Sequence, residues 1–315
     1  LFIFININKF MNIENKLLAR NSSIFDADLL DNLKYFTEEI SNSSFLVIGA
    51  AGSIGASVST ELFKKNPSKL HLVDISENNM VELVRGLRST IGYSSGEFKP
   101  IILDVGSDEF KKFVDIEGPY DYILNLSAMK HVRSENDPFS LIRLIEINIM
   151  NPLSILDVLN NSKFKKYFCV STDKASNPIN MMGASKRIME ISLMNQMDQN
   201  PISTARFANV AFSDGSLLHG FEQRIKRNQP LSVPSDISRY FVTHNEASEL
   251  CLFSCLKGNS GEIFFPKLSE KLSEVSFKSL AIDYLKIKGF KPLFCDSEQE
   301  AREEVKSISR GYWPL

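Results

Sequence analysis

The sequence predicts an α/β fold with a doubly wound parallel sheet, followed by a smaller C-terminal lobe. From residue 45 to residue 207, short apolar runs alternate with segments of helical periodicity. This alternation is the order that produces parallel strands joined by right-handed helical crossovers. Runs such as residues 45–48 (FLVI) are apolar at every position, which indicates strands covered by helices on both faces. After about residue 209 the pattern loosens into shorter elements, and this favours a separate small lobe.

The expected elements follow in order along the chain. Strands are expected at residues 45–48, 70–74, 100–104, 122–126, 167–170 and 203–207. Helices are expected to begin at residues 54, 79 and 108, and to span residues 138–159 and 186–197. In the lobe we expect helices at residues 219–226, 246–257 and 277–287, with short strands near 240–243 and 263–265.

The N-terminal segment, residues 12–44, is expected to be a helical extension that packs or joins subunits and carries no chemistry. Its apolar residues Leu29, Leu30, Leu33 and Phe36 recur at helical spacing, and Asp26 is the expected cap. Residues 1–10 are apolar but are followed by no small-residue cleavage site, so we expect no signal peptide and regard residue 11, a methionine, as a candidate start. The chain stops at residue 315 without a polar tail, which suggests a truncated C-terminus.

The composition is that of an ordinary globular protein. The 315 residues are 43% hydrophobic and carry a net charge of −2, so no basic field exists for nucleic acid or anionic lipid. No uninterrupted apolar run approaches the ~20 residues needed to span a bilayer, so no membrane span is expected. The four cysteines, Cys169, Cys251, Cys255 and Cys295, match neither a disulfide framework nor a zinc pattern. We therefore expect no metal and reduced thiols in the cytoplasm, with Cys251 and Cys255 neighbours on one helix face.

A glycine-rich loop, residues 49–55 (GAAGSIG), directly follows the first strand and opens a helix. In this context Gly49 provides a tight turn, Gly52 lets the backbone approach a pyrophosphate, and Gly55 lets helix and strand pack closely. The helix N-terminus, which begins with Ser53 and Ile54, supplies amides and a positive dipole. These features indicate a Rossmann-like dinucleotide site, whereas a purely structural glycine turn is the alternative.

Two acidic residues at strand ends indicate which dinucleotide binds and where. Asp74 lies about twenty residues beyond the last glycine, where a carboxylate accepts hydrogen bonds from the ribose 2′-hydroxyl and repels a 2′-phosphate. Residues 75–77 offer no arginine to reverse this preference, so NAD is favoured over NADP. Asp104 and Val105 end the third strand, where adenine is often contacted, although an aspartate there is also a common turn residue.

The block of residues 171–186 (STDKASNPINMMGASK) follows an apolar strand and ends in a lysine that opens a helix. Asp173 and Lys174 place an acid and a base side by side at the strand end, as general acid–base chemistry requires. The alternative is a solvated ion pair. Met182 stands four residues before Lys186, where many enzymes of similar layout carry a tyrosine, and a thioether cannot transfer a proton.

Five motifs in this order carry a resemblance to a known family. They are residues 49–55 (GAAGSIG), 127–132 (SAMKHV), 171–186, 206–210 (RFANV) and 238–243 (SRYFVT). From about residue 45 to residue 266 the chain resembles the extended short-chain dehydrogenase/reductase superfamily. Within it, the chain is similar to the NAD-dependent UDP-N-acetylglucosamine 4,6-dehydratases of bacterial polysaccharide and glycan biosynthesis, which are lyases. The sequence pattern and the resemblance together divide the chain into a helical extension over residues 1–44, a Rossmann domain over 45–209 and a substrate-binding lobe over 210–315. The extension and the end of the chain lie outside the resemblance.

The resemblance also implies a reaction and residue roles. The sugar is oxidised at C4, loses H5 and the 6-hydroxyl as water, and regains the hydride at C6. Asp173 is then the acid, Lys174 the base, Thr172 a hydrogen-bond partner near O4, and Lys186 a ligand of the nicotinamide ribose. Lys174 can act as a base only if its pKa falls, which burial and nearby Lys186 could bring about. Met182 is shared with a subgroup of these dehydratases, in which proton transfer passes to Thr172 and Asp173.

The remaining site residues follow from the same motifs. The predicted cofactor-binding residues are Gly49, Gly52, Ser53, Ile54, Gly55, Asp74, Asp104, Val105, Leu126, Ser127, Ala128 and Lys186. The predicted substrate-binding residues are Lys130, Asn209, Ser216 and Arg239, and the arginine suits a diphosphate. His131 is expected only to satisfy a loop carbonyl. The superfamily implies a homo-oligomer. A nucleotide-sugar epimerase and a non-catalytic NAD-binding protein with a core methionine at position 182 remain open as alternatives.

Overall fold

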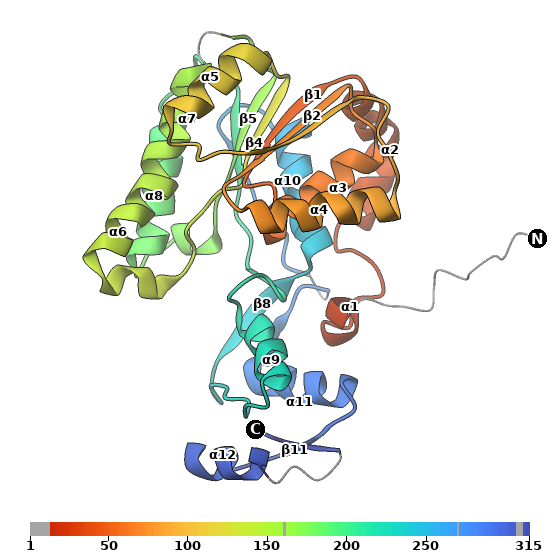
Figure 1. Cartoon of the computed structure of the whole chain (residues 1–315), viewed down its shortest axis with the longest axis vertical. Helices are drawn as coiled ribbons and strands as arrows, with labels where there is room; N and C mark the ends of the chain where they lie inside the picture. The colour runs from red at the N-terminus through yellow and green to blue at the C-terminus, as the bar shows by residue number, and fades with distance from the viewer. Residues whose placement is uncertain (1–12, 160–161, 270, 307–310) are drawn as a thin grey trace, which may run out of the picture. The chain divides into compact units, whose positions relative to one another are not determined.

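The computed structural model describes residues 13–159, 162–269, 271–306 and 311–315. The apolar residues 1–10 and the candidate start at residue 11 lie outside this part of the chain. The chain forms two compact units (Figure 1). We call Phe25–Phe207 with His244–Pro266 the sheet unit, and the described residues up to Ile24 with Ala208–Thr243 and Lys267–Leu315 the small unit.

The sheet unit is built on a seven-stranded sheet in the order β3-β2-β1-β4-β5-β6-β9. All neighbouring strands in it run parallel, which confirms the predicted α/β class. The strands are β1 (Ser44–Ile48), β2 (Lys69–Asp74), β3 (Glu97–Ile102), β4 (Tyr122–Asn125), β5 (Lys166–Val170), β6 (Ile202–Ala205) and β9 (Glu262–Phe264). Their order reverses at β1, which pairs with β2 on one edge and β4 on the other, and such a reversal is where doubly wound sheets bind ligands.

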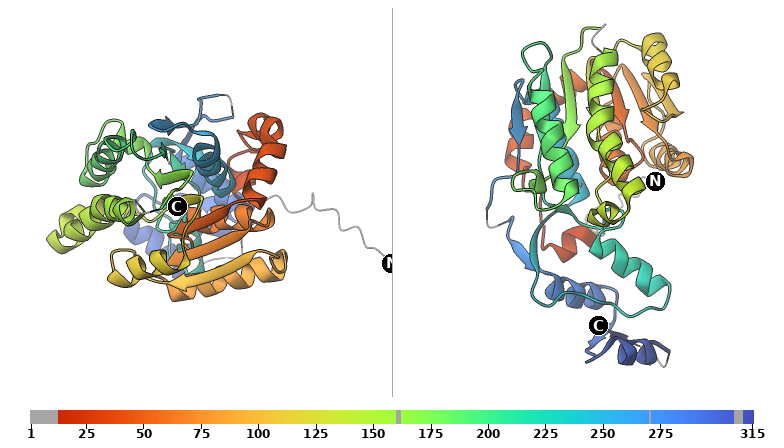
Figure 2. Two further views of the ribbon diagram at one scale, coloured as in Figure 1. Left: turned by 90° about the horizontal axis from the view of Figure 1, so that it is seen from above. Right: turned by 90° about the vertical axis from the view of Figure 1, so that its left-hand side faces the viewer.

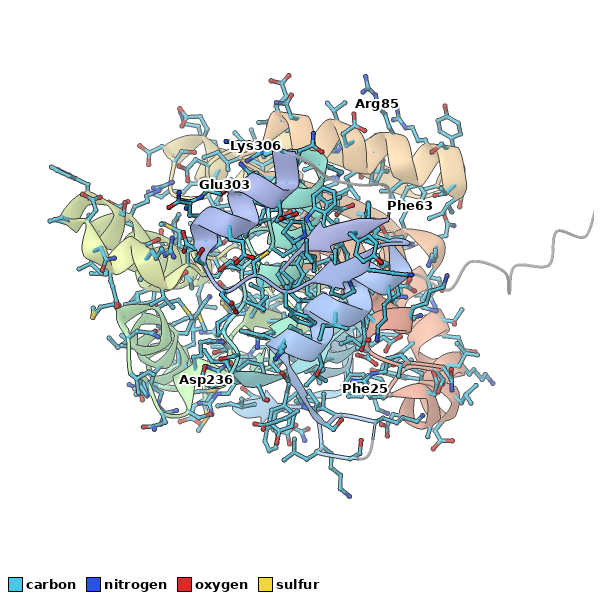
Figure 3. All side chains as sticks on the ribbon, turned by 90° about the horizontal axis from the view of Figure 1, so that it is seen from below. Phe25, Phe63, Arg85, Asp236, Glu303 and Lys306 are labelled. Carbon is cyan, nitrogen blue, oxygen red and sulfur yellow. The ribbon has the colours of Figure 1, made fainter. Side chains whose placement is uncertain are left out.

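Helices cover both faces of this sheet (Figure 1). One face carries α2 (Asp26–Ser41), α3 (Ser53–Lys64), α4 (Glu77–Thr90) and α10 (His244–Lys257). The other carries α5 (Asp108–Glu117), α6 (Pro138–Ile145), a π-helical turn (Glu146–Met150), α7 (Asn151–Leu159) and α8 (Met181–Met194), of which α7 and α8 run side by side (Figure 2). On α4, Met80 and Leu87 are buried whereas Arg85 points into solvent (Figure 3). Burial of the strands on both faces explains their continuous apolar runs.

Helix α8 begins earlier than the sequence pattern predicts. We expected its start near Lys186, but its first residue is Met181. Asn180 occupies the N-cap position, and its side-chain oxygen accepts the backbone N–H of Gly183 at 2.9 Å. This cap satisfies a free amide of the first turn and allows the helix to start before its apolar periodicity becomes clear.

Helix α2 corrects two expectations. Asp26 is the first helical residue and not the cap, since Phe25 holds the N-cap position without a side-chain cap hydrogen bond. Of the predicted apolar stripe, Phe36 is buried and Leu29 is partly buried, whereas Leu30 and Leu33 are 73% and 52% exposed. The buried side is set by Phe36, whose ring meets Phe253 of α10 at a centroid distance of 4.7 Å, and by Ile40 one turn later. The segment is therefore a covering helix of the sheet unit.

The small unit has its own sheet and core. Strands β7 (Asn209–Val210), β8 (Ser238–Val242) and β10 (Glu274–Ser276) form a sheet, and β11 (Lys291–Leu293) pairs with β12 (Tyr312–Pro314). Its helices are α1 (Ile13–Leu17), α9 (Leu217–Lys226), α11 (Phe277–Ile287) and α12 (Glu298–Lys306), and the charged Glu303 and Lys306 of α12 are exposed (Figure 3). Phe221, Tyr284 and Trp313 anchor its apolar core.

The boundaries of the two units differ from the three consecutive segments that the sequence suggests. The break near Phe207 lies close to the expected one, but residues 244–266 return to the sheet unit. They do so because β9 pairs with β6 as an edge strand of the main sheet, and α10 packs on α3. Such a return depends on pairing between distant segments, which local periodicity does not reveal.

The helical stretch from α6 to α7 corrects the expectation that no segment could span a membrane. Among the described residues, one helical stretch, Pro138–Leu159, is long enough and apolar enough to cross a membrane, judged by length and composition alone. Polar residues such as Arg143 and Asn148 interrupt it, which is why no uninterrupted apolar run is visible in the sequence. Leu144, Ile155 and Leu156 of this stretch are buried in the sheet unit, so part of the stretch covers the sheet.

The four cysteines are free thiols, as expected. Cys251 and Cys255 are both buried on α10, four residues apart. Burial raises the pKa of each, and it raises the pKa of the Cys169 thiol to about 11. Thiols of this kind are unreactive because little thiolate is present near neutral pH.

We predict that Leu124→Ala in β4 lowers the free energy of unfolding by about 2–5 kcal/mol, because Leu124 is fully buried and its truncation leaves a cavity. The matched control is Leu30→Ala on α2, which should stay within about 0.5 kcal/mol of the wild type because Leu30 is exposed. Urea unfolding followed by circular dichroism measures both. Equal losses in the two variants would contradict the described burial.

Candidate active site

A cavity of about 230 Å³ lies within the sheet unit at the carboxyl ends of the central strands. The sequence predicted eight of the residues that line it: Gly49, Gly52, Asp74, Asp104, Val105, Leu126, Ser127 and Ala128. Seven more were not predicted: Ile48, Val73, Ile75, Leu103, Arg143, Ile147 and Asn151. Ser53, Ile54, Gly55 and Lys186 do not line it. The cavity lies where the strand order reverses, which is the position expected for a dinucleotide.

The three glycines of the loop are required for different physical reasons. Gly49 has φ +73°, and a Cβ there would lie 2.6 Å from the backbone nitrogen of Ser127. A Cβ on Gly55 would lie 1.9 Å from the carbonyl oxygen of Gly49, so helix α3 could not pack on the loop. A Cβ on Gly52 would make only an ordinary contact of 3.5 Å. The fold itself therefore requires Gly49 and Gly55, whereas Gly52 leaves open the approach to the helix N-terminus.

Asp74 at the end of β2 is held by backbone amides. One carboxylate oxygen accepts the N–H of Ala51 at 2.9 Å and the other accepts the N–H of Ser76 at 2.8 Å. The carboxylate thus ties the glycine loop to β2 while it lines the cavity. Each oxygen retains a further lone pair, so the group can still accept a hydrogen bond from a ribose hydroxyl.

Asp104 is paired with a residue that the sequence did not suggest. Its carboxylate accepts the Gly106 amide at 2.9 Å and the Arg143 guanidinium at 3.0 Å. These two donors outweigh partial burial and hold the pKa of Asp104 below its usual value. Arg143 also pairs with Glu146 at 3.1 Å. The one available signal was that Arg143 is the single basic residue in the apolar stretch 138–159.

A second unpredicted residue, Asn148, orders the loop after β4. It is fully buried in the π-helical turn, and its side chain exchanges two hydrogen bonds with the backbone of Met129, at 2.9 and 2.8 Å. It also donates to the hydroxyl of Ser185 on α8 at 3.0 Å. Lys130 and His131 follow on this loop and are exposed, and His131 makes no side-chain cap to the 3₁₀ turn that follows it.

The predicted acid and base lie in contact on a short turn after β5. Thr172 caps this 3₁₀ turn, Asp173–Ala175, and its hydroxyl donates to the Asp173 carboxylate at 3.0 Å. The Asp173 oxygen lies 3.2 Å from the Lys174 ammonium nitrogen. The side chains of Asp173 and Lys174 are 47% and 36% exposed. The burial that we expected for Lys174 is therefore not present, because the turn projects both side chains from the end of the sheet.

Lys186 and Met182 lie one helical turn apart on α8, and both are buried. The Lys186 ammonium donates to the carbonyl of Val170, at the end of β5, at 3.0 Å. Burial lowers the pKa of Lys186. The lysine therefore contacts the strand that leads into the turn Asp173–Ala175. Met182 places a thioether at the position where many enzymes of similar layout carry a tyrosine.

The other predicted substrate residues belong to the small unit. Asn209 lies on β7 and its amide donates to the carbonyl of Tyr240 at 3.4 Å. Ser216 caps α9 through the backbone N–H of His219. Arg239 is exposed on β8, and β7 and β8 are neighbours in one sheet. Asn209 and Arg239 therefore lie on adjacent strands, whereas Lys130 belongs to the sheet unit.

Comparison with known proteins places the chain among its relatives. The sequence profile of the polysaccharide biosynthesis protein family matches residues 45–305. The chain belongs to this family. It is 31% identical to the capsular polysaccharide biosynthesis protein CapD of Staphylococcus aureus over 87% of this chain and 45% of that protein. It is also 31% identical to an uncharacterized membrane protein of Methanocaldococcus jannaschii, over 81% of this chain and 77% of that protein. The chain thus spans less than half of the length of CapD.

Several solved structures of other proteins share the fold of this chain. Pen from Bacillus thuringiensis has a TM-score of 0.69 at 25% identity, over 79% of this chain and 74% of that chain. WbmF of Bordetella bronchiseptica, crystallised with NAD+, has a TM-score of 0.65 at 18% identity, over 80% of each chain. DesIV of Streptomyces venezuelae, a dTDP-glucose 4,6-dehydratase, has a TM-score of 0.66 at 16% identity, over 78% of this chain and 81% of that chain. The latter two likenesses establish the Rossmann-like fold.

The glycine geometry separates a binding effect from a folding effect. We predict that Gly52→Ala unfolds at the wild-type temperature but binds NAD at least about tenfold more weakly, because only the approach of the pyrophosphate is blocked. Gly55→Ala should lower the unfolding temperature itself, because its Cβ would overlap the Gly49 carbonyl. Calorimetric titration with NAD and thermal unfolding measure the two effects. Wild-type NAD affinity in Gly52→Ala would contradict the assigned approach.

Proposed function

We propose that this chain is an NAD-dependent UDP-N-acetylglucosamine 4,6-dehydratase, a cytoplasmic lyase that serves surface polysaccharide or glycan biosynthesis. The observation that carries the proposal is the contact between Asp173 and Lys174 on a capped turn of the unit that also holds the dinucleotide-type cavity. Membership of the polysaccharide biosynthesis family supports the pathway class. The free thiols suit a reducing compartment.

NAD fits the cavity better than NADP does. The anchored carboxylate of Asp74 suits a free ribose 2′-hydroxyl and repels a 2′-phosphate. Gly52 and the N-terminus of α3 suit a pyrophosphate. When bound, NAD supplies reversible hydride acceptance from the sugar. WbmF and DesIV, which share the fold, were both crystallised with this cofactor, and this supports the assignment.

The Asp173–Lys174 pair can provide both proton transfers of the elimination. At 3.2 Å the Lys174 ammonium can pass its proton to the Asp173 carboxylate, which yields a neutral acid beside a neutral base. Asp173 then protonates the departing 6-hydroxyl while Lys174 accepts H5. Water is released and the charged pair is restored, so the proton count balances. Thr172, which already binds Asp173, is placed to hydrogen-bond near O4.

In this proposal the buried residues beside the turn have supporting roles. Lys186 binds the nicotinamide ribose and Met182 takes no part in proton transfer. In the small unit, Asn209, Ser216 and Arg239 bind the nucleotide sugar, with the arginine on the diphosphate. Lys130 on the loop after β4 contributes from the sheet unit. The three-part division into residues 1–44, 45–209 and 210–315 then describes roles along the chain.

Two other functions remain distinguishable. The UDP-glucose 4-epimerase of Rickettsia bellii is 27% identical over 76% of this chain and 70% of its own length, so an epimerase is the second candidate. An epimerase would yield a product of unchanged mass and new stereochemistry at C4. A non-catalytic NAD-binding protein is favoured only by Met182, and it would yield no product at all.

We predict that the protein, incubated with NAD and UDP-N-acetylglucosamine, forms a product lighter by one water, detected by mass spectrometry. Asp173→Asn and Lys174→Ala should each lower kcat by about 10²- to 10⁴-fold, because each removes a proton-transfer group. Asp198→Asn, at an exposed aspartate on the surface of the sheet unit, is the control and should leave kcat unchanged. Wild-type turnover in both active-site variants, or a product of unchanged mass, would overturn the dehydratase assignment.

We also propose that the chain forms a homo-oligomer. Helices α6 and α8, which contact each other, expose Phe139 and Ile142 and Ile188 and Ile191, respectively. Exposed apolar groups of this kind favour association. Ile188→Glu should shift the mass measured by size-exclusion light scattering from that of the wild type to that of a smaller species. Leu30→Glu on α2, at an even more exposed leucine on the opposite face of the sheet, should leave the mass unchanged. A monomeric wild type would contradict this.

A further inference from the structure

A buried carboxylate, Glu190 of α8, lies beneath the catalytic turn and is 1% exposed. One of its oxygens accepts the hydroxyl of Ser171 at 2.6 Å and the Nε of Arg206 at 2.7 Å. The other accepts a second nitrogen of Arg206 and, at 3.3 Å, a nitrogen of Arg187. A buried charge is tolerated only when it is paired and hydrogen-bonded. Burial raises the pKa of Glu190, but the hydrogen bonds outweigh it and the pKa lies below its usual value.

Arg206 carries this network to the far end of the turn. It directly follows β6, and its backbone N–H is bonded to Phe264 of β9 at 2.7 Å, so its position is set by the sheet. Two of its guanidinium nitrogens bind Glu190, and the third donates to the hydroxyl of Ser176 at 3.0 Å. The fork geometry of arginine allows both contacts at once.

The two serines of the network bracket the reacting pair. Ser171 comes immediately before Thr172, and Ser176 comes immediately after the turn Asp173–Ala175. Backbone hydrogen bonds tie the same segment to β6 and its extension, from Ser171 N–H to Ala205 at 2.8 Å and from Asp173 N–H to Phe207 at 3.3 Å. The side chains of Asp173 and Lys174 are thus partly exposed to solvent. Both ends of their turn are held, at Ser171 by Glu190 and at Ser176 by Arg206.

We propose that Glu190 and Arg206 form a positioning clamp that holds the Asp173–Lys174 pair in its reacting geometry by fixing Ser171 and Ser176 at the two ends of the turn. Neither residue is catalytic. The proposal rests on the proposed function in that the pair performs the proton transfers. The competing role for Glu190 and Arg206 is a buried ion pair that stabilises the fold and has no particular effect on the turn.

Three variants separate these roles. Ser176→Ala removes an exposed hydroxyl and the outer contact of the clamp, but leaves the buried ion pair intact. Arg206→Lys keeps the charge but has no fork to reach both Glu190 and Ser176. Arg187→Ala is the matched control. Arg187 shares one of the two Glu190 oxygens with Arg206, but it lies on α8 and its side chain is 45% exposed.

With UDP-N-acetylglucosamine as substrate, we expect kcat to fall by about 10- to 100-fold in Arg206→Lys and by about 3- to 10-fold in Ser176→Ala, because small misplacements of reacting groups are costly. The affinity for NAD should stay within about twofold of the wild type, since no residue of the clamp lines the dinucleotide-type cavity. The KM should also stay within about twofold, because a misplaced proton-transfer group slows the chemical step and leaves substrate binding unchanged. Arg187→Ala should match the wild type. A smaller fraction of folded protein would also lower the apparent kcat at unchanged KM. The kcat of each variant is therefore expressed per NAD-binding site, with the number of sites taken from the calorimetric titration.

Hydrogen–deuterium exchange provides a readout that does not require turnover. The amides of Ala175 and Ser176 donate to Thr172 and Asp173 at 3.1 and 3.0 Å, and they should exchange faster in Ser176→Ala and Arg206→Lys. The unfolding temperature of Ser176→Ala should remain that of the wild type. Wild-type exchange and kcat in Ser176→Ala would overturn the clamp, as would faster exchange throughout the sheet unit in Arg206→Lys. If the wild type dehydrates no nucleotide sugar, the proposed function fails, and the exchange pattern still decides the clamp.

Discussion

The close approach of two backbones, at Gly49 after β1 and Ser127 after β4, is the constraint on which the cavity depends. Parallel pairing sets Ile48 beside Asn125, so the loops that follow the two strands must turn against each other. A side chain at position 49 would lie within 2.6 Å of the Ser127 backbone, and only glycine fits. This turn directs the N-terminus of α3 toward the carboxyl ends of the strands, where Asp74 then ties the loop to β2. The glycine loop that lines the cavity is therefore held in place by the sheet.

Near this edge of the sheet, buried polar groups tie the loops after β4 and β5 to the sheet or to the helices that cover it. The side-chain oxygen of Asn125 accepts a hydrogen bond from the Ser127 hydroxyl at 2.7 Å. Asn148 joins the loop at Met129 to Ser185 of α8. Glu190 does the same for the turn after β5. Such groups are costly when unpaired and rigid when fully paired, because a low dielectric strengthens each hydrogen bond. The arrangement leaves the side chains of Asp173 and Lys174 partly exposed while the backbone of their turn is held.

Lys186 differs from these paired groups, because its burial destabilises the fold. A buried ammonium with a lowered pKa is unfavourable for folding, since the unfolded chain binds the proton more readily. Its destabilising effect is greatest below the lowered pKa and fades as the pH rises toward the unfolded value. Its position next to the strand that leads into the turn Asp173–Ala175 suits the role proposed for it in cofactor binding. The fold alone does not distinguish a dehydratase from an epimerase, because structures of both kinds share it, and the chemistry of the turn has to decide.

The alternation of strands and helices along the chain, the glycine loop with Asp74 and the adjacency of Asp173 and Lys174 were determined by the sequence itself, because each depends on local periodicity or short spacing. The start of α8 differed because a cap at Asn180 acts before the periodic pattern begins. Only the tertiary structure decided the partnership of Arg143 with Asp104, the clamp of Glu190 and Arg206, the exposure of Lys174 and the return of residues 244–266 to the sheet. These features join segments far apart in the chain, and no local pattern encodes which distant side chains will meet once the strands have paired.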